Sequence, residues 1–210
     1  MKHPPSITQL LSAQAERLDL PLSPDRISAL AEAMEWLGPA AFRFGLTNYA
    51  TTPEFAANLV APALVLLADG VFGLVKSPAL DFGAGSGAVG LALAVLCPEI
   101  EVILADRRTR VVQFLDLSLR RLRLTNCSAR QADLANPTAD LAQAVGTVLI
   151  RAFGPTPTAL TYASRLIRPG GSIALWHQPP APPPPADLRL LDTHSTGVPS
   201  LALTIYQRGL

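Results

Sequence analysis

Cysteine and histidine are scarce in this chain of 210 residues, which contains only two Cys and three His. Cys97 and Cys127 lack the close spacing of metal ligands and are too few for a disulfide framework. The histidines are scattered along the chain, so the sequence predicts no metal site. Unpaired cysteines fit a reducing compartment, and we expect a cytoplasmic protein.

The formal net charge is also small, at +1 at pH 7. A balanced chain of this kind has no overall attraction to a polyanion. No cationic segment followed by an apolar core opens the chain, so we expect no secretory signal. The strongly apolar stretch 55–75 is interrupted by Asn58, Pro62 and Asp69. This pattern predicts a buried helix and no membrane partner.

Positive charge is nevertheless concentrated in one segment, between residues 107 and 130, where only Asp116 opposes it. The segment contains Arg107, Arg108, Arg110, Arg120, Arg121, Arg123 and Arg130. Such a run is typical either of a solvated helix face or of a patch that contacts phosphates. The sequence leaves both interpretations open.

Glycine forms the most informative motif of the chain. Residues 81–90 read Asp-Phe-Gly-Ala-Gly-Ser-Gly-Ala-Val-Gly, before an apolar run that starts at Leu91. This order predicts a strand, a glycine-rich turn and a helix start, where backbone N–H groups can approach a ligand closely. The spacing of Gly85, Gly87 and Gly90 also satisfies the dinucleotide-binding pattern, so the glycines alone do not identify the ligand.

Two acidic residues narrow the choice of ligand. Asp106 follows Gly85 by about 20 residues, where an acid binds the ribose of either a dinucleotide or S-adenosylmethionine (SAM). Asp81 lies two residues before the first glycine. An acid there is unusual in nicotinamide-binding proteins and common in SAM methyltransferases, where it faces the cationic methionine end. The pair therefore favours SAM.

The hydrophobic pattern divides the chain into two parts, a helical extension over 1–76 and a core over 77–210. In the extension we expect helices at 6–19 and 24–37, the second stopped by Gly38-Pro39, and a third helix from Thr52. The core alternates strands and helices, which predicts a mainly parallel sheet covered on both faces. The expected core strands are 79–82, 102–105, 129–131, 147–150 and 172–176, with helices at 108–122 and 158–167 and a final antiparallel pair at 188–191 and 201–206. The proline-rich segment 179–185, between the strand at 172–176 and the strand at 188–191, is expected to be a stiff connector or a partner-binding site.

Several motifs together resemble the RsmG/GidB family, bacterial methyltransferases that act on a guanine N7 in small-subunit (16S) ribosomal RNA. The similar segments are Leu46-Thr47, the turn at 81–90, Leu104-Ala105-Asp106, Arg110, Phe114-Leu115, Leu122-x-Leu124-x-Asn126 and Arg151-Ala152-Phe153. The resemblance implies a Rossmann-like class I SAM-dependent methyltransferase fold, with a mainly parallel seven-stranded sheet and an N-terminal helical extension. It also implies a monomer that acts on ribosomal RNA or on a small ribosomal subunit particle.

The resemblance assigns roles to individual residues. Gly83, Gly85, Gly87 and Ala88 would shape the turn around the cofactor. Asp81 would face the methionine amino group, Asp106 the ribose hydroxyls, and Asp133 and Leu134 the adenine. Arg151 would position cofactor and substrate, and Arg107, Arg108, Arg110, Arg120, Arg121 and Arg123 would bind RNA. Because N7 of guanine has an available lone pair, no general base is required.

The chain also departs from the family pattern. Val89 stands in place of the proline of the turn, Gly45 in place of an asparagine, and Val111 in place of an arginine. The region 59–63 lacks the family's His and Asp. Aromatic residues that could stack on a base are few, with Trp176, Phe153 and Tyr49 as candidates. Two alternatives therefore remain, a methyltransferase of a small molecule and a non-catalytic SAM-fold protein that binds a partner.

Overall fold

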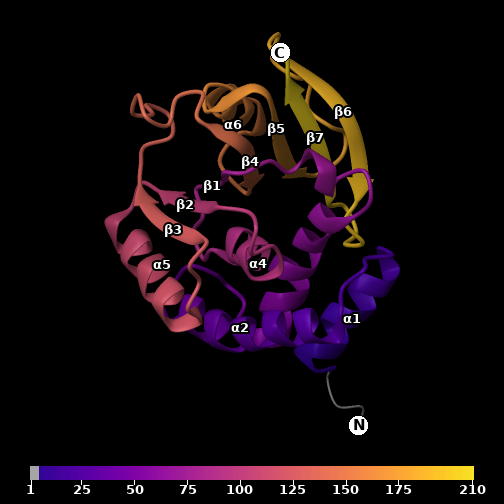
Figure 1. Cartoon of the computed structure of the whole chain (residues 1–210). Coiled ribbons are helices and arrows are strands. Elements are labelled where there is room, and N and C mark those ends of the chain that lie inside the picture. Colours follow the sequence, from indigo (N-terminus) through magenta and orange to yellow (C-terminus); the bar gives the residue numbers. More distant parts are fainter. Residues whose placement is uncertain (1–4) are drawn as a thin grey trace.

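A computed structural model describes residues 5–210 and begins with two amphipathic helices (Figure 1). The first four residues of the expected extension lie outside the described residues. Helix α1 spans Ile7–Arg17, and the Ser6 hydroxyl caps it by accepting from the backbone N–H of Gln9 at 3.2 Å. Helix α2 spans Pro24–Arg43, with Ser23 as its N-cap and proline at its first position. Both helices were expected from these signals.

Helix α2 does not stop at Gly38-Pro39, so the predicted end of this helix is wrong. Proline inside a helix removes a backbone hydrogen bond and crowds the preceding turn. Here the turn beyond it is stabilised by burial, since Ala40 and Ala41 are almost inaccessible to solvent. Gly38 lets Phe55 pack closely, because a β-carbon at Gly38 would lie 3.4 Å from that ring. Tertiary packing thus outweighs the local helix-breaking signal.

The apolar stretch 55–75 is buried as expected, but it is not one continuous helix. Helix α3 spans Thr52–Phe55 and starts with a capping box between Thr51 and Glu54. A π-helical turn, η1 (Ala56–Val60), and two 3₁₀ segments, η2 (Ala61–Leu67) and η3 (Phe72–Leu74), follow it. Pro62 lacks the N–H that a regular α-helix needs at this point, which accounts for the change of helix type. Within residues 5–210 no helix is both long and apolar enough to span a membrane.

The core is a seven-stranded sheet in the order β3-β2-β1-β4-β5-β7-β6. Strands β1 to β5 are parallel, and β7 runs antiparallel between β5 and β6. The strands are β1 (Ala79–Phe82), β2 (Val102–Asp106), β3 (Cys127–Gln131), β4 (Val145–Arg151), β5 (Ile167–His177), β6 (Leu188–Ser195) and β7 (Ala202–Arg208). Helices α4 (Ala88–Leu96), α5 (Thr109–Leu122) and α6 (Thr156–Ser164) connect them. The predicted class I methyltransferase fold is confirmed, although β2 to β7 each extend beyond the predicted bounds. The helix predicted over 158–167 ends at Ser164, because β5 already begins at Ile167.

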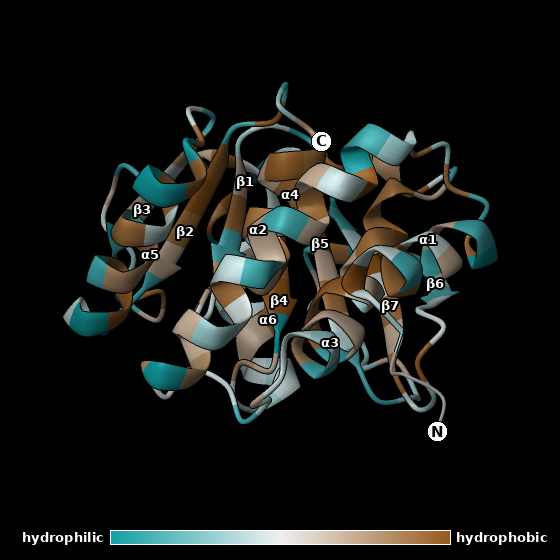
Figure 2. Ribbon diagram, turned by 90° about the horizontal axis from the view of Figure 1, so that it is seen from below, coloured by the Kyte–Doolittle hydropathy of each residue, from teal (hydrophilic) through white to brown (hydrophobic). Residues whose placement is uncertain are grey.

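The two faces of the sheet are covered unequally. Helices α1, α2, α4 and α5 lie on one side and α6 on the other (Figure 1). On the first side one apolar cluster joins the N-terminal helices to α4 and α5, for example through Leu11, Met34 and Phe114. In Figure 2 the outward turns of α2 and α5 are hydrophilic and the strands beneath them hydrophobic. The expected helical extension therefore shares its hydrophobic core with the parallel sheet.

The proline-rich segment 179–185 runs from β5 to β6 on the second side. Tyr206 of β7 is fully buried, and its hydroxyl donates to the carbonyl oxygen of Pro182 at 2.7 Å. The segment is therefore attached to the sheet in the manner of a stiff connector. Its alternative role as a partner-binding site stays a prediction.

Strand order places one edge of the sheet in position for ligands. After β1 the chain crosses to β2 on one side, whereas β4 lies on the other side of β1. In open α/β sheets the loops diverge at such a point, and a crevice forms beyond the carboxyl ends of the strands. The glycine turn after β1 and Arg151 at the end of β4 lie there.

Candidate functional site

The turn between β1 and α4 requires glycine. Gly83 and Gly85 have φ angles of +72° and +54°, and Gly87, which starts α4, has +75°. L-residues with a side chain rarely adopt this left-handed region. Gly83 also makes room for a ring, since a β-carbon there would lie 2.6 Å from Phe153 Cδ2. At Gly85 an added β-carbon would have space, since its nearest neighbour would be the Gly83 carbonyl oxygen at 3.7 Å.

Asp81 of β1 lies beneath this turn and is only 5% exposed. Its Oδ2 accepts the backbone N–H of Gly90, in the first turn of α4, at 2.9 Å. Burial raises the pKa of the Asp81 carboxyl to about 6, although the Gly90 N–H and the charge of Arg151 act in the opposite direction. At neutral pH the group is largely ionised and held next to the crevice.

Gly90 is a residue whose structural role the sequence reasoning missed. A β-carbon at Gly90 would lie 2.4 Å from Leu104 Cδ2 and 2.9 Å from Asp81 Oδ2. Only glycine lets α4 approach β1 and β2 closely enough to donate to the carboxylate. The signal was present in the last glycine of the dinucleotide-like pattern, whose usual role is close packing of helix on strand.

Asp106 ends β2, two residues beyond Leu104, the register partner of Asp81, and is 4% exposed. Its Oδ1 accepts from the backbone N–H and the Nε of Arg108, each at 3.0 Å. Its Oδ2 accepts from Arg108 Nη2 at 3.0 Å and from the Gly85 N–H at 3.2 Å. Burial favours the neutral acid, but these hydrogen bonds and the charge of Arg108 outweigh it and lower the pKa of Asp106.

Two adjoining pockets flank the glycine turn. The first has a volume of about 310 Å³ and includes Asp81 and Arg151 in its wall. The second has a volume of about 480 Å³ and includes Asp106 and Phe153. Both are lined by Gly83, Arg108 and Ala152, so they meet at the turn. The two adjoining pockets make up the crevice at the carboxyl end of the sheet.

The predicted cofactor residues gather around this crevice. Asp81, Gly83, Gly85, Ala88 and Arg151 line the first pocket, and Gly83, Asp106, Asp133 and Leu134 line the second. Gly87 is the exception, because a β-carbon there would meet Leu91 and Leu115 at 2.8 Å and not the crevice. The roles assigned to these residues remain predictions.

Arg151 joins the sheet to the N-terminal helical layer. Its Nη1 donates to the carbonyl oxygen of Leu59 at 2.5 Å, and its Nη2 donates to that of Asn58. Both carbonyls belong to η1. Burial lowers the pKa of the guanidinium, while Tyr49 and Asp81 oppose that change. Arg151 therefore fixes one wall of the first pocket.

Asp133 and Leu134 differ in exposure although they are neighbours. Asp133 is exposed, and its Oδ1 accepts the backbone N–H of Ala135 at 3.1 Å, so it stabilises its own turn. Leu134 is 3% exposed and packs in the core beneath the second pocket. The wall beside them includes Tyr162, which the sequence reasoning did not single out.

The candidates for base stacking differ in position. Trp176 is 4% exposed, and its Nε1 donates to the carbonyl oxygen of Pro62 at 3.1 Å, so this candidate is a core residue and is not available to stack on a base. Phe153 packs edge-on against Phe82, with ring centroids 4.4 Å apart, and lines the second pocket. Tyr49 is half-buried against the main apolar cluster.

The predicted RNA-binding arginines are spread along α5 and do not converge at the crevice. Arg107 and Arg108 line the second pocket, and Arg108 is paired with Asp106. The Arg110 guanidinium lies over the Phe44 ring, 5.6 Å from its centroid. Arg120, Arg121 and Arg123 lie at the far end of the helix, and the last two line a separate groove. Arg130, part of the same run, is paired with Asp140 at 2.5 Å.

Comparison with known proteins places this arrangement in a family. Residues 26–178 match the GidB family model, described as rRNA small subunit methyltransferase G. A protein of that name from Desulfitobacterium hafniense is 30% identical over 160 residues, covering 74% of this chain and 64% of the relative. One from Thermotoga neapolitana is 29% identical over 105 residues, covering 50% and 46%. The matched region thus spans about half to two thirds of these relatives.

A solved structure supports the fold independently. A SAM-dependent methyltransferase from Aquifex aeolicus superposes with a TM-score of 0.54 at 18% sequence identity, covering 72% of this chain and 91% of that chain. Likeness at this level concerns the fold alone. The family model covers most of the chain, including the glycine turn and both strand-end acids. The chain therefore belongs to the GidB family, rRNA small subunit methyltransferase G.

Proposed function

We propose that this protein binds SAM and methylates N7 of a guanine in small-subunit ribosomal RNA. The observation that carries the proposal is the pair of buried carboxylates, Asp81 and Asp106, at the ends of adjacent strands on either side of an open glycine turn. They occur in a chain of the GidB family, whose described members are named for methylation of small-subunit rRNA.

The crevice fits the chemistry of SAM. The first pocket has the Asp81 carboxylate, which suits a cationic amino-acid end. The second has Asp106, which suits a ribose diol, together with Leu134 and Phe153, which offer apolar and aromatic surface to a planar base. The two pockets share Gly83, Arg108 and Ala152 in their walls, so they meet beside the glycine turn. We infer that Asp81 and Asp106 hold the two ends of one cofactor molecule.

When bound, SAM supplies an electrophilic methyl group on its sulfonium. Guanine N7 carries its own lone pair, so the protein has no proton to remove before methyl transfer. Its task is to orient the base and keep water out. Leu46, Thr47 and Leu59 also line the first pocket, and we infer that they receive an unpaired or flipped guanine.

Arg151 acts in this scheme as a positioning residue. Its guanidinium holds the carbonyls of Asn58 and Leu59, so it fixes the helical layer that supplies the Leu59 side of the pocket. Removing it leaves two carbonyls without their donor and loosens that wall. We therefore expect Arg151→Ala to lower methyl transfer more than SAM affinity.

The test is mass spectrometry of ribosomal RNA from bacterial cells that lack their own enzyme and express this chain. We expect 7-methylguanosine in the small-subunit RNA with the wild type, and its loss with Asp106→Ala and Arg151→Ala. Arg189→Ala, an exposed arginine on the distant strand β6, serves as the matched control. In vitro transfer to naked RNA and to small-subunit particles would then identify the substrate form. SAM binding without 7-methylguanosine would overturn the proposed substrate.

A further inference from the structure

A groove lies at the end of α5 farthest from Asp106, roughly 20 Å away at the usual helical rise. Its volume is about 540 Å³, within the range of small-molecule and cofactor sites. Its walls come from α2, from the end of α4 and from the end of α5, and include Glu32, Trp36, Val95, Arg121 and Arg123. None of these residues belongs to the crevice at the glycine turn.

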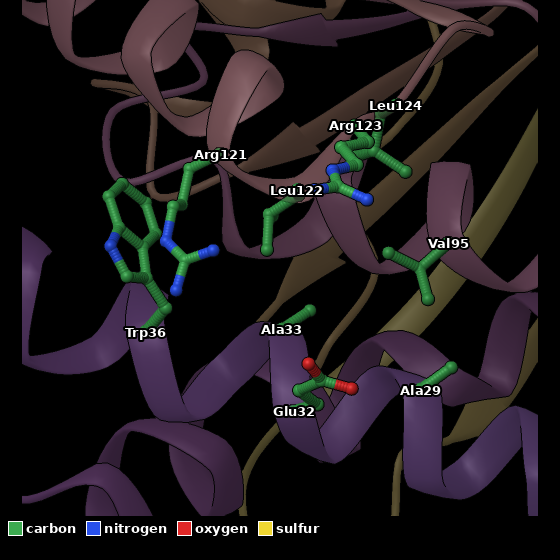
Figure 3. A pocket seen from close by; sticks show the side chains of 9 residues that line it. All are labelled: Ala29, Glu32, Ala33, Trp36, Val95, Arg121, Leu122, Arg123 and Leu124. Carbon is green, nitrogen blue, oxygen red and sulfur yellow. The ribbon is translucent and has the colours of Figure 1, made fainter.

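The polar groups of the groove face its interior. Figure 3 shows the Arg121 side chain extended beside the Trp36 indole, Arg123 reaching between Leu122 and Val95, and the Glu32 carboxylate directed into the groove. Within the described part of the chain, no ion pair shorter than 4.0 Å joins Glu32 to either arginine. Two guanidinium groups against one carboxylate leave an excess of positive charge.

The Trp36 indole is held in place from behind. It stacks on Phe114 with ring centroids 6.3 Å apart and an interplanar angle of 13°. Phe114 in turn contacts Phe44 at 5.0 Å, and Arg110 lies over Phe44. The rings of Phe44, Phe114 and Trp36 thus form a row. Arg110 lies at its Phe44 end, and Arg121 lies at its Trp36 end in the groove. The half-buried Trp36 indole, stacked on Phe114 and next to Arg121, therefore offers a stacking surface beside anion-binding groups.

We propose that this groove binds one unpaired nucleotide of the substrate RNA, at a position away from the methylated guanine. The base would pack against Trp36, and Arg121 and Arg123 would contact its phosphates. Glu32 would accept a hydrogen bond from an exocyclic amine, so adenine, guanine and cytosine are favoured over uracil. A paired nucleotide does not present its base face, so the bound segment is single-stranded. This inference rests on RNA being the substrate, as proposed above.

Arginines at the end of a helix also complement its macrodipole, which accounts for Arg120 and Arg121 without any ligand. That role concerns stability and requires neither a tryptophan wall nor an opposing carboxylate. The two roles therefore predict different behaviour. A purely structural role lowers thermal stability on substitution and leaves RNA binding unchanged, whereas the groove alters RNA binding and leaves SAM affinity unchanged.

The test uses single-stranded RNA homopolymers of about ten nucleotides and the full chain, with binding followed by anisotropy at salt concentrations from about 50 to 200 mM. We expect the double variant Arg121→Gln/Arg123→Gln to weaken binding of oligoadenylate and to reduce the salt slope by about 1.4, the value for two phosphates of a single strand. Trp36→Leu is expected to weaken it about fivefold to a hundredfold. Glu32→Gln is expected to reduce the preference for oligocytidylate over oligouridylate.

Intrinsic fluorescence gives a second readout. The chain contains two tryptophans, and Trp176 is buried with its Nε1 bound to Pro62, so quenching by RNA reports on Trp36. Arg189→Gln on β6 removes one positive charge far from the groove and is expected to bind RNA as the wild type does. Calorimetric SAM affinity and circular dichroism show that each variant is folded.

Two results would overturn the inference. The first is RNA affinity of the double arginine variant and of Trp36→Leu within twofold of that of Arg189→Gln. The second is a parallel loss of SAM affinity, which would assign these residues to the fold. The RNA-binding assay needs no methyl transfer, so it separates the two proposals. If the groove variants weaken RNA binding but no 7-methylguanosine forms, only the proposed modification is rejected. If methyl transfer occurs and the groove variants bind RNA as the wild type does, only the proposed groove is rejected.

Discussion

Arg108 donates to both carboxylate oxygens of Asp106, through Nε to Oδ1 and through Nη2 to Oδ2, each at 3.0 Å. Two backbone N–H groups, of Arg108 and Gly85, reach the same oxygens. A carboxylate offers about four lone-pair positions, so all of them are filled from within the chain. Ribose hydroxyls that bind Asp106 therefore have to replace the Arg108 side chain.

The first prediction concerns this competition. Arg108→Ala frees two acceptor positions on Asp106 while both backbone donors stay in place. The Arg108 side chain is 57% exposed, and exposed ion pairs contribute less than about 1 kcal/mol, so SAM affinity should rise about two- to fivefold. Isothermal titration of SAM and of its demethylated product measures the change. Arg189→Ala on β6, outside both pockets, is the control, and weaker SAM binding by Arg108→Ala would show that Arg108 assists the cofactor.

Asp106→Ala is expected to act in the opposite direction. It removes the acceptor for the ribose hydroxyls and for the Gly85 N–H, which should weaken SAM binding by about 1–3 kcal/mol. The lowered pKa means that the ionised Asp106 stabilises the fold above the unfolded-state pKa, and this contribution is lost as the pH falls through the folded-state pKa. Unfolding in urea at pH 7 should therefore show a modest loss of stability and a cooperative transition. Unchanged SAM affinity would make Asp106 a purely structural residue.

Local sequence patterns were sufficient to predict the parts of the site in which a residue type at a given spacing has one common structural role. The spacing of the glycines and of the two strand-end acids was enough to predict that Gly83, Gly85, Asp81 and Asp106 line one crevice, whereas Gly87 faces Leu91 and Leu115. The pairing of Asp106 with Arg108 could not be predicted. A run of arginines has the same sequence pattern whether one of them pairs with a nearby carboxylate or all of them face solvent. Arg108 and Arg130 are paired, whereas Arg121 and Arg123 line a groove.

The fold could also be predicted where local patterns have one common meaning, and could not be predicted where tertiary packing overrides them. Strand and helix alternation defined the parallel sheet and its order of elements. Gly38-Pro39 predicts a helix end because both residues disfavour helix locally, yet burial of Ala40 and Ala41 keeps α2 intact. Helix breakers can be judged only with knowledge of what packs on them. The same holds for Trp176, whose place in the core depends on a hydrogen bond to Pro62 from a distant segment.

The glycines of the turn should separate binding from folding. Gly90→Ala places a β-carbon 2.4 Å from Leu104 Cδ2 and should destabilise the fold by about 1–3 kcal/mol.

At Gly85 the nearest atom to an added β-carbon is the Gly83 carbonyl oxygen at 3.7 Å, so Gly85→Val meets no clash there. It strains a backbone with φ of +54° and projects a branched side chain toward the crevice, and SAM binding should be lost. Denaturant unfolding and calorimetry measure the two effects, and normal SAM binding by Gly85→Val would show that the turn does not contact the cofactor.

Asp81→Asn should increase stability and abolish function together. The pKa of Asp81 is raised from 3.8 to about 6 in the folded protein, so between pH 4 and 6 the folded state holds a proton that the unfolded state has lost. Stability therefore falls as the pH rises through this window and levels off above it, where burial of the charge costs about 1–3 kcal/mol. Asparagine carries no charge, and its carbonyl oxygen can still accept the Gly90 N–H.

We therefore expect Asp81→Asn to be more stable than the wild type at pH 7.5, with a smaller dependence of stability on pH between 4 and 6. SAM binding should be strongly weakened, because the cationic amino-acid end loses its counter-charge. Wild-type SAM affinity should itself fall as the pH drops below about 6, since the protonated carboxyl has to release its proton to pair with the ammonium group. Urea unfolding and SAM titration at several pH values test both statements. A variant that is less stable than the wild type at pH 7.5 and binds SAM equally well would assign Asp81 to packing of α4 alone.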